Sequence, residues 1–167
     1  DSYLPNGRGM SPLFNQILKG KRDIISTVFK CEENIDDGKI AFKKNFYYPD
    51  NIVYDEIKKL QIENNIILIK KFIFLFEKKK IKLKKQSGKA TYFKKISAKK
   101  NNINKNKSIS SQFQKIRTRD NKYFRAFFIH KKRTVCNISY NMVNLSLIKI
   151  TKKHIKYSLN NTCIIKR

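Results

Sequence analysis

The sequence predicts a small folded chain of mixed helices and strands, and three observations support this. Hydrophobic residues make up 40% of the 167 residues and aromatic residues 12%, with 12 Phe and 8 Tyr. This is too apolar for a fully disordered chain. Apolar residues recur at helical spacing in some segments and alternate in others. At this length one small domain with extensions is expected.

The charge is distributed unevenly. Residues 1–77 contain 12 Lys+Arg and 11 Asp+Glu, whereas residues 78–167 contain 27 Lys+Arg and one acid, Asp120. Such a basic half repels itself unless a polyanion neutralises it. Nucleic acid is the polyanion to expect, because each neutralised phosphate also releases a counterion. Aromatic residues interleaved with the basic ones, as in Lys122-Tyr123-Phe124-Arg125, are typical of RNA binding.

The first half of the chain predicts two helices and two strands. Ser11-Pro12 is a plausible start for a short helix that ends near Gly20. Residues 39–48 alternate loosely and predict a strand, and residues 52–62 predict a short helix. The run 66–76 is rich in Ile and Phe, which favours a buried strand, although a helix remains open.

The second half begins with a segment, residues 84–111, that reads as a flexible or RNA-ordered linker. Residues 112–138 then predict a β-hairpin with a basic tip, in which Phe124, Ala126 and Phe128 share one face. A short helix or turn follows over residues 141–150, and residues 151–167 form a basic tail.

The sequence favours a protein that is not an enzyme and needs no metal or other cofactor. The two histidines have no carboxylate nearby in sequence, and no glycine-rich phosphate loop occurs. Asp36-Asp37-Gly38 is better explained as a turn, and Asp55-Glu56 as the start of a helix, than as metal ligands. The three cysteines are far apart, which indicates free thiols in a reducing compartment. Neither a membrane span nor a secretory signal is expected.

The hairpin region resembles a known family. Phe127–Val143, FFIHKKRTVCNISYNMV, is similar to the signature of universal small-subunit ribosomal protein family number nineteen. The family's Lys-Lys pair falls on Lys131-Lys132, and its Asn-Met-Val triplet falls on Asn141-Met142-Val143. Pro12, Leu18 and Lys21 lie at offsets compatible with the family's opening helix. The chain departs from the family where His130 replaces the turn glycine and where the tail elements are lost.

The resemblance implies an α+β fold, in which a short N-terminal helix packs on a small antiparallel sheet, with a large insertion and a basic C-terminal tail. It divides the chain into residues 1–24, an insertion over 25–110, the hairpin and helix over 111–150, and the tail over 151–167. It implies a structural constituent of a small ribosomal subunit that binds rRNA in the subunit head. Its partners would be rRNA and neighbouring head proteins, including the family-thirteen ribosomal protein, with no small-molecule substrate and no membrane.

The abundance of Lys, Asn and Ile further suggests a mitochondrial ribosome and an organelle-encoded gene. Another basic ribosomal protein, a ribosome-assembly factor and a DNA-compacting protein remain alternatives. The residues expected to contact RNA are basic side chains of the first helix, the hairpin region and the tail, together with one asparagine. They are Lys19, Lys21, Arg22, Lys115, Arg117, Arg119, Lys122, Lys131, Lys132, Arg133, Asn141, Lys149, Lys152 and Lys153.

Overall fold

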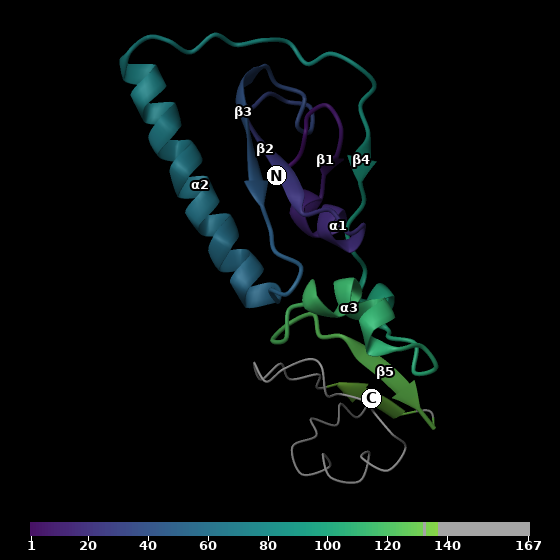
Figure 1. Cartoon of the computed structure of the whole chain (residues 1–167). Coiled ribbons are helices and arrows are strands. Elements are labelled where there is room, and N and C mark those ends of the chain that lie inside the picture. The colour runs from purple at the N-terminus through teal and green to yellow at the C-terminus, as the bar shows by residue number, and fades with distance from the viewer. Residues whose placement is uncertain (132, 137–167) are drawn as a thin grey trace. The chain divides into compact units, whose positions relative to one another are not determined.

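The computed structural model describes residues 1–131 and 133–136, and the chain divides into two compact units, residues 1–97 and residues 98–167 (Figure 1). The first unit contains β1 (Arg8–Gly9), α1 (Pro12–Leu18), β2 (Asp23–Phe29), β3 (Ile40–Tyr47), α2 (Tyr54–Glu77) and β4 (Tyr92–Phe93). The second contains a 3-10 turn (Ala98–Asn101), α3 (Ile109–Arg117), β5 (Phe127–His130) and β6 (Arg133–Cys136). The coarse prediction of a mixed α+β chain is therefore confirmed.

The predicted N-terminal helix is confirmed as α1, which begins at Pro12 directly after Ser11. Proline suits this position because its fixed φ angle is helical and its missing N–H would have no partner there. The helix ends at Leu18, close to the predicted end. Gly20, two residues later, has a φ angle of 77° and donates its N–H to the Ile17 carbonyl (2.8 Å), which turns the chain away from the helix.

The core of the first unit lies between α1, the β2–β3 hairpin and α2. The predicted strand over residues 39–48 is confirmed as β3, which pairs antiparallel with β2 and places Phe46 opposite Ile24. The side chains that form this core come from these four elements and from Tyr48, directly after β3, and are buried together. They are Leu13, Ile17, Ile24, Phe46, Tyr48, Ile57 and Leu68.

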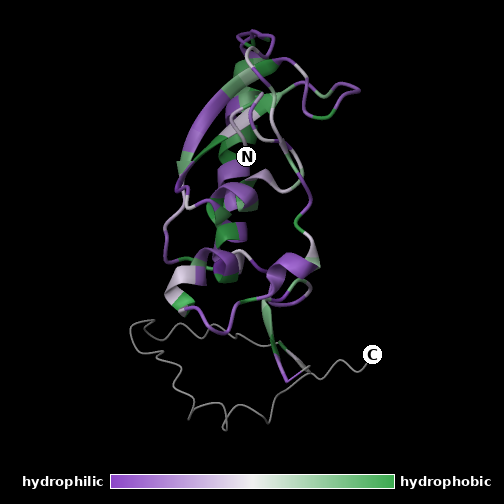
Figure 2. Cartoon of the chain, turned by 90° about the vertical axis from the view of Figure 1, so that its right-hand side faces the viewer, coloured by the Kyte–Doolittle hydropathy of each residue, from purple (hydrophilic) through white to green (hydrophobic). Residues whose placement is uncertain are grey.

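The prediction of a strand over residues 66–76 is wrong, because this segment is the second half of the 24-residue helix α2. No glycine or proline interrupts the chain between Pro49 and Gly88, so a helix that begins at Tyr54 can continue. Glu56 accepts a hydrogen bond from the Val53 N–H (2.9 Å), which supports the prediction that Asp55-Glu56 begins a helix. Hydrophobic and hydrophilic residues both occur along α2 (Figure 2). No helix in the described part of the chain is both long and apolar enough to cross a membrane.

The second unit confirms the predicted hairpin but not the segments before it. β5 and β6 pair antiparallel from Phe127–Cys136 to His130–Arg133. Residues 84–111 are not a structureless linker, since they contain β4, the 3-10 turn and the start of α3. A helix, α3, occupies Ile109–Arg117, where the sequence predicted the beginning of the hairpin region. Its Ile116 forms a small core with Ile103 and Ala126, whereas Phe124, predicted to share a face with Ala126, is exposed.

The predicted helix over residues 141–150 and the tail over residues 151–167 lie outside the described residues. The domain boundaries drawn from the ribosomal resemblance stay a prediction.

Candidate functional site: the acidic turn and its clamp

Two very short strands bring the beginning of the chain against a segment more than 80 residues later. β1 runs parallel to β4, with Arg8 opposite Tyr92 and Gly9 opposite Phe93. Gly9 has a φ angle of 93°, and a Cβ atom at this position would lie 2.7 Å from the Phe93 carbonyl oxygen. Glycine is therefore required for the two backbones to approach this closely.

The acidic turn, residues 36–38, lies in the connection between β2 and β3. A hydrogen bond from the Lys30 N–H to the Lys39 carbonyl (2.9 Å) joins the two ends of this connection. A Cβ atom on Gly38 would lie 1.6 Å from the Lys30 carbonyl oxygen, so only glycine fits. Asp36 has a φ angle of 52°, in the left-handed region that costs a non-glycine residue about 1 kcal/mol or more. The predicted turn at Asp36-Asp37-Gly38 is confirmed, and its backbone is strained.

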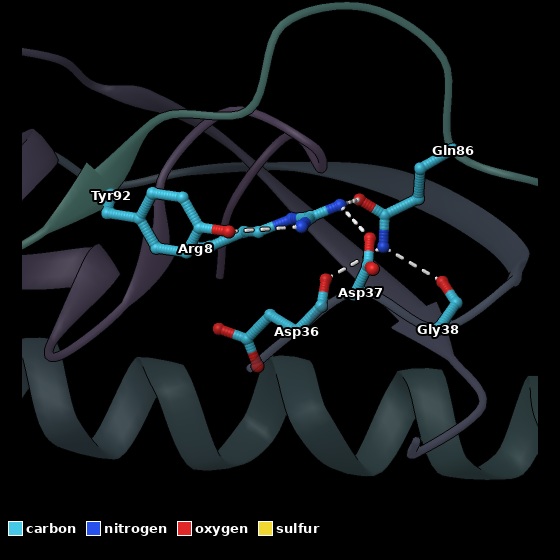
Figure 3. Close-up of polar contacts among 6 residues, drawn as sticks. All are labelled: Arg8, Asp36, Asp37, Gly38, Gln86 and Tyr92. Carbon is cyan, nitrogen blue, oxygen red and sulfur yellow. Dashed lines mark hydrogen bonds and ion pairs between the residues drawn. The ribbon is translucent and has the colours of Figure 1, made fainter. Parts of the chain in front are cut away.

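Arg8 links this turn to β4. Its side chain is buried, and its Nη2 atom forms an ion pair with Asp37 and donates a hydrogen bond to Gln86 Oε1 (2.8 Å). Its Nη1 atom donates to the Tyr92 hydroxyl (3.2 Å) (Figure 3). Burial lowers the pKa of Arg8, but the hydrogen bonds to Tyr92 and Asp37 and the Asp37 charge outweigh it, so the pKa is raised. The guanidinium is thus a fixed charge that is neutralised within the cluster.

Gln86 completes the arrangement from a third segment. Its side-chain nitrogen donates to two backbone carbonyls of the turn, those of Asp36 (2.7 Å) and Gly38 (2.8 Å). Figure 3 shows this amide between the Arg8 guanidinium and the turn. We call Arg8 and Gln86 together the clamp, because they hold the turn, β1 and β4 to one another.

Asp36 differs from Asp37 in what its carboxylate does. The Asp37 carboxylate forms the ion pair with Arg8. Asp36 is half-buried, and its Oδ2 atom accepts a hydrogen bond from the Gly9 N–H (2.8 Å). Its Oδ1 atom has no hydrogen bond to any residue that the structure describes. A carboxylate with one oxygen fixed and the other open can accept a proton or a hydrogen bond from a bound molecule.

Sequence reasoning missed most of this site. Asp36-Asp37-Gly38 was recognised only as a turn, Tyr92 was considered only as part of the aromatic and basic pattern typical of RNA binding, and Arg8 and Gln86 were not singled out. The signal that could have found them is a pair of acids followed by glycine, in the part of the chain where acids and bases nearly balance. Among the described residues, no group of three or more His, Cys, Asp or Glu could hold a metal ion.

The described residues that were predicted to bind RNA are not members of the cluster formed by Arg8, Asp36, Asp37, Gln86 and Tyr92. Lys19, Lys21, Arg22, Lys122 and Lys131 are exposed, and Lys115 is half-buried. Arg117 and Arg119 are buried, with 0% and 4% of their surface exposed. The backbone of Arg133 lies in β6, and Lys132, Asn141, Lys149, Lys152 and Lys153 fall outside the described residues. Contact of these side chains with RNA stays a prediction.

Comparison with known proteins gives a consistent similarity to formyltransferases. No family model matches the chain. It is 31% identical over 96 residues to methionyl-tRNA formyltransferases of Bartonella quintana and Bartonella henselae, a match that covers 57% of this chain and 31% of each relative. The chain therefore spans about a third of the length of these curated relatives.

Solved structures give the same result. The structure is similar to methionyl-tRNA formyltransferase from Clostridium thermocellum, with a TM-score of 0.69 and 28% identity, over 86% of this chain and 61% of that one. It is also similar to an N-formyltransferase from Helicobacter canadensis, solved with folinic acid and dTDP-3-aminofucose, with a TM-score of 0.63 and 23% identity, over 86% and 56% of the two chains. The chain has the fold seen in part of these enzymes.

These findings overturn the ribosomal resemblance and the function and partners that it implied. The similar proteins are enzymes, so the expectations of a protein that is not an enzyme, of rRNA and ribosomal head proteins as partners, and of no small-molecule substrate are wrong. The alternatives of another ribosomal protein, an assembly factor or a DNA-compacting protein do not match either. The resemblance misled because one of its anchors, Lys131-Lys132, is a short pair in the lysine-rich half of the chain. Its other anchor, Asn141-Met142-Val143, is a short triplet in an Asn-rich sequence.

Proposed function

We propose that this chain is part of an enzyme that transfers a formyl group to a primary amine, with methionyl-tRNA as the acceptor. The observation that carries the proposal is the 31% identity over 96 residues to methionyl-tRNA formyltransferases. The likeness to the Clostridium thermocellum enzyme supports it, since it extends over 86% of the chain.

Asp36 is the side chain we assign to the reaction. In formyl transfer the amine nitrogen attacks the carbonyl carbon of an N-formyl donor, and a new C–N bond forms. The amine loses one proton, the C–N bond of the donor breaks, and the donor nitrogen takes up a proton. Asp36 suits the first proton transfer because Oδ2 is fixed by the Gly9 N–H and Oδ1 is open. The clamp residues hold the turn that carries Asp36 and take no proton.

The charge of the chain favours a tRNA acceptor over a nucleotide sugar. A net charge of +27 suits a ligand with many phosphates, because the electrostatic gain grows with each phosphate neutralised. The likeness to the sugar-modifying enzyme from Helicobacter canadensis, at 23% identity, supports the fold alone.

The test is a transfer assay with the purified protein that contains this chain, methionyl-tRNA and a formylated folate as the N-formyl donor. We expect formyl-methionyl-tRNA to form, and Asp36→Asn to lower the rate by about 100-fold or more, because the amide is a far weaker proton acceptor. Asp50→Asn is the control, since Asp50 is exposed and pairs with Arg22 on the surface. Transfer to an amino sugar but not to methionyl-tRNA would contradict the acceptor, and equal rates for both Asp variants would contradict the role of Asp36.

A further inference from the structure

The acidic turn is held by contacts that its own sequence does not supply. Asp36 is in the left-handed region, and the chain passes so close to the Lys30 carbonyl that Gly38 has no room for a side chain. A backbone of this kind persists only where its surroundings fix it. Within the turn itself, the Asp37 N–H bond to the Asn34 carbonyl is long, at 3.4 Å. The strong constraints therefore come from outside.

Gln86 is the side chain that constrains both ends of the turn. The two carbonyls it binds belong to Asp36 and Gly38, the residues on either side of Asp37. The backbone of the Gln86 segment is fixed in turn by a bridge two residues earlier. There Lys84 and Ile40 exchange two hydrogen bonds, Ile40 N–H to Lys84 O (2.7 Å) and Lys84 N–H to Ile40 O (2.9 Å). Gln86 thus acts from a backbone that is tied to the first residue of β3.

The chemistry of the site requires an amide at this position. One end of the side chain must donate to two carbonyl oxygens, and the other must accept from the Arg8 guanidinium (2.8 Å). A glutamine side chain does both at once. A carboxylate accepts from Arg8 but repels the two carbonyl oxygens, and an alanine does neither.

We propose that Gln86 is a positioning residue for the reaction, which holds the acidic turn so that the Asp36 carboxylate stays against the Gly9 N–H with its second oxygen open. The inference rests on the proposed function, because Gln86 affects the reaction only by holding Asp36 in place. It concerns placement alone, since Gln86 makes no contact with the Asp36 carboxylate and binds only its backbone carbonyl.

The first readout is hydrogen exchange of the Gly9 amide, which donates to Asp36 Oδ2, measured by NMR on the full chain. In Gln86→Ala we expect this amide to exchange about tenfold faster or more, because each hydrogen bond lost is worth about 1 kcal/mol. The Ile57 amide, in the core at the start of α2, should keep its protection and serves as the reference for global unfolding.

Gln112→Ala is the matched control. The Gln112 side chain also donates to several backbone carbonyls, among them that of Asn104 (2.9 Å), and accepts from the Asn104 N–H (2.7 Å). It is therefore a similar amide contact in the other unit. This variant should loosen residues 104–108 and leave Gly9 unchanged.

Gln86→Glu gives a pH signature that loss of packing alone does not produce. At neutral pH the introduced carboxylate faces two carbonyl oxygens, so Gly9 should lose protection as in Gln86→Ala. As the pH falls through the pKa of that carboxyl, its O–H becomes a donor to one of the carbonyls. Gly9 protection, taken relative to the original chain at each pH, should then partly return.

The second readout is the transfer assay. Gln86→Ala should lower kcat by about tenfold or more and leave KM for methionyl-tRNA nearly unchanged, because a misplaced reacting group costs rate rather than binding. If Gly9 exchange depends on Gln86 but the protein that contains this chain transfers no formyl group, the proposed function fails and the positioning contact stands.

If Gly9 exchange in Gln86→Ala is unchanged, or rises only as much as Ile57 exchange does, the inference is overturned. The same holds if Gln86→Glu shows no recovery at low pH, or if kcat stays the same while Gly9 is deprotected.

Discussion

Arg8 and Arg119 are both almost fully buried, with 6% and 4% of their surface exposed, yet their charges are treated in opposite ways. Arg8 is paired with Asp37 and bonded to Gln86 and Tyr92, and its pKa is raised. Arg119 donates only a long hydrogen bond to Thr118 (3.4 Å) among the described residues, and burial lowers its pKa. The Nε atoms of both arginines have no partner among the described residues, so the difference lies in the Nη atoms and their acidic partner.

The difference follows from where the acids are in the chain. Residues 1–97 contain 11 Asp+Glu, whereas residues 98–167 contain only Asp120. Asp120 accepts hydrogen bonds from the backbone N–H groups of Lys122 and Tyr123, and so closes a turn. The first unit can therefore neutralise a buried guanidinium, and the second has almost nothing with which to do so. A buried arginine can therefore connect several segments through its ion pair and hydrogen bonds, as Arg8 does, or carry a charge that burial disfavours, as Arg119 does.

The largest expected effect is on the paired arginine. We expect Arg8→Met to destabilise residues 1–97 by about 3 kcal/mol, because it leaves Asp37, Gln86 and Tyr92 without their common partner. The estimate is at the low end for a broken buried ion pair, since the Asp37 side chain is 43% exposed and can hydrate. The measurement is the free energy of opening from exchange of the buried amides of α2 and β3.

Arg22→Met is its control. Arg22 and Asp50 form an ion pair at 3.1 Å, but both side chains are about half exposed. Removing this pair should cost no more than about 0.5 kcal/mol. Equal losses of stability in the two variants would mean that the burial of Arg8 does not strengthen its ion pair with Asp37.

The sequence predicted the elements whose signals are local. Pro12 after Ser11 placed α1, alternation placed β3, and the basic tip between apolar runs placed the β5–β6 hairpin. The segment 66–76 failed because a short run of Ile and Phe fits a strand and a helix equally well. The segment is helical because the helix that begins at Tyr54 continues through it without a glycine or proline to end it.

The clamp could not be predicted from a single sequence. Arg8 meets Gln86 and Tyr92 across 78 and 84 residues, and neither Gln nor Tyr at those positions has a local signal. The ribosomal interpretation failed for a related reason. It relied on a short motif and on total charge, whereas the residues that carry the site are polar groups brought together by the parallel pairing of β1 and β4.

An intermediate effect is expected for a buried polar group that is neutral. Tyr48 is fully buried, and its hydroxyl accepts a hydrogen bond from Asn64 Nδ2 (3.2 Å). Tyr48→Phe should cost about 1 to 1.5 kcal/mol, because Asn64 is left buried without its acceptor. Tyr47→Phe is the control, since Tyr47 is 55% exposed and should change stability little. A loss as large as that of Arg8→Met would mean that loss of a buried partner, and not charge, determines the cost.

The same pair of variants separates burial from charge through pH. Burial raises the pKa of Tyr48, while the Asn64 hydrogen bond lowers it by less. The unfolded chain has the ordinary tyrosine pKa of about 10, so the stability due to neutral Tyr48 is fully present below pH 10. It is lost as the pH rises from there through the folded pKa. Urea unfolding between pH 9 and 11 should show a steeper decline for Tyr47→Phe than for Tyr48→Phe, and identical slopes would contradict the shift.

The smallest expected effect, and the one opposite in direction, is on the unpaired arginine. Arg119→Met keeps most of the side-chain volume and removes a charge that burial disfavours. We expect residues 98–131 to lose no stability or to gain up to about 1 kcal/mol, as when buried charges are replaced by apolar residues of similar size. Exchange of the Ile116 amide in α3 measures this change, with Lys122→Met as an exposed control near zero. A loss of about 3 kcal/mol, as predicted for Arg8→Met, would mean that Arg119 has a strong stabilising partner, and the two buried arginines would then be alike.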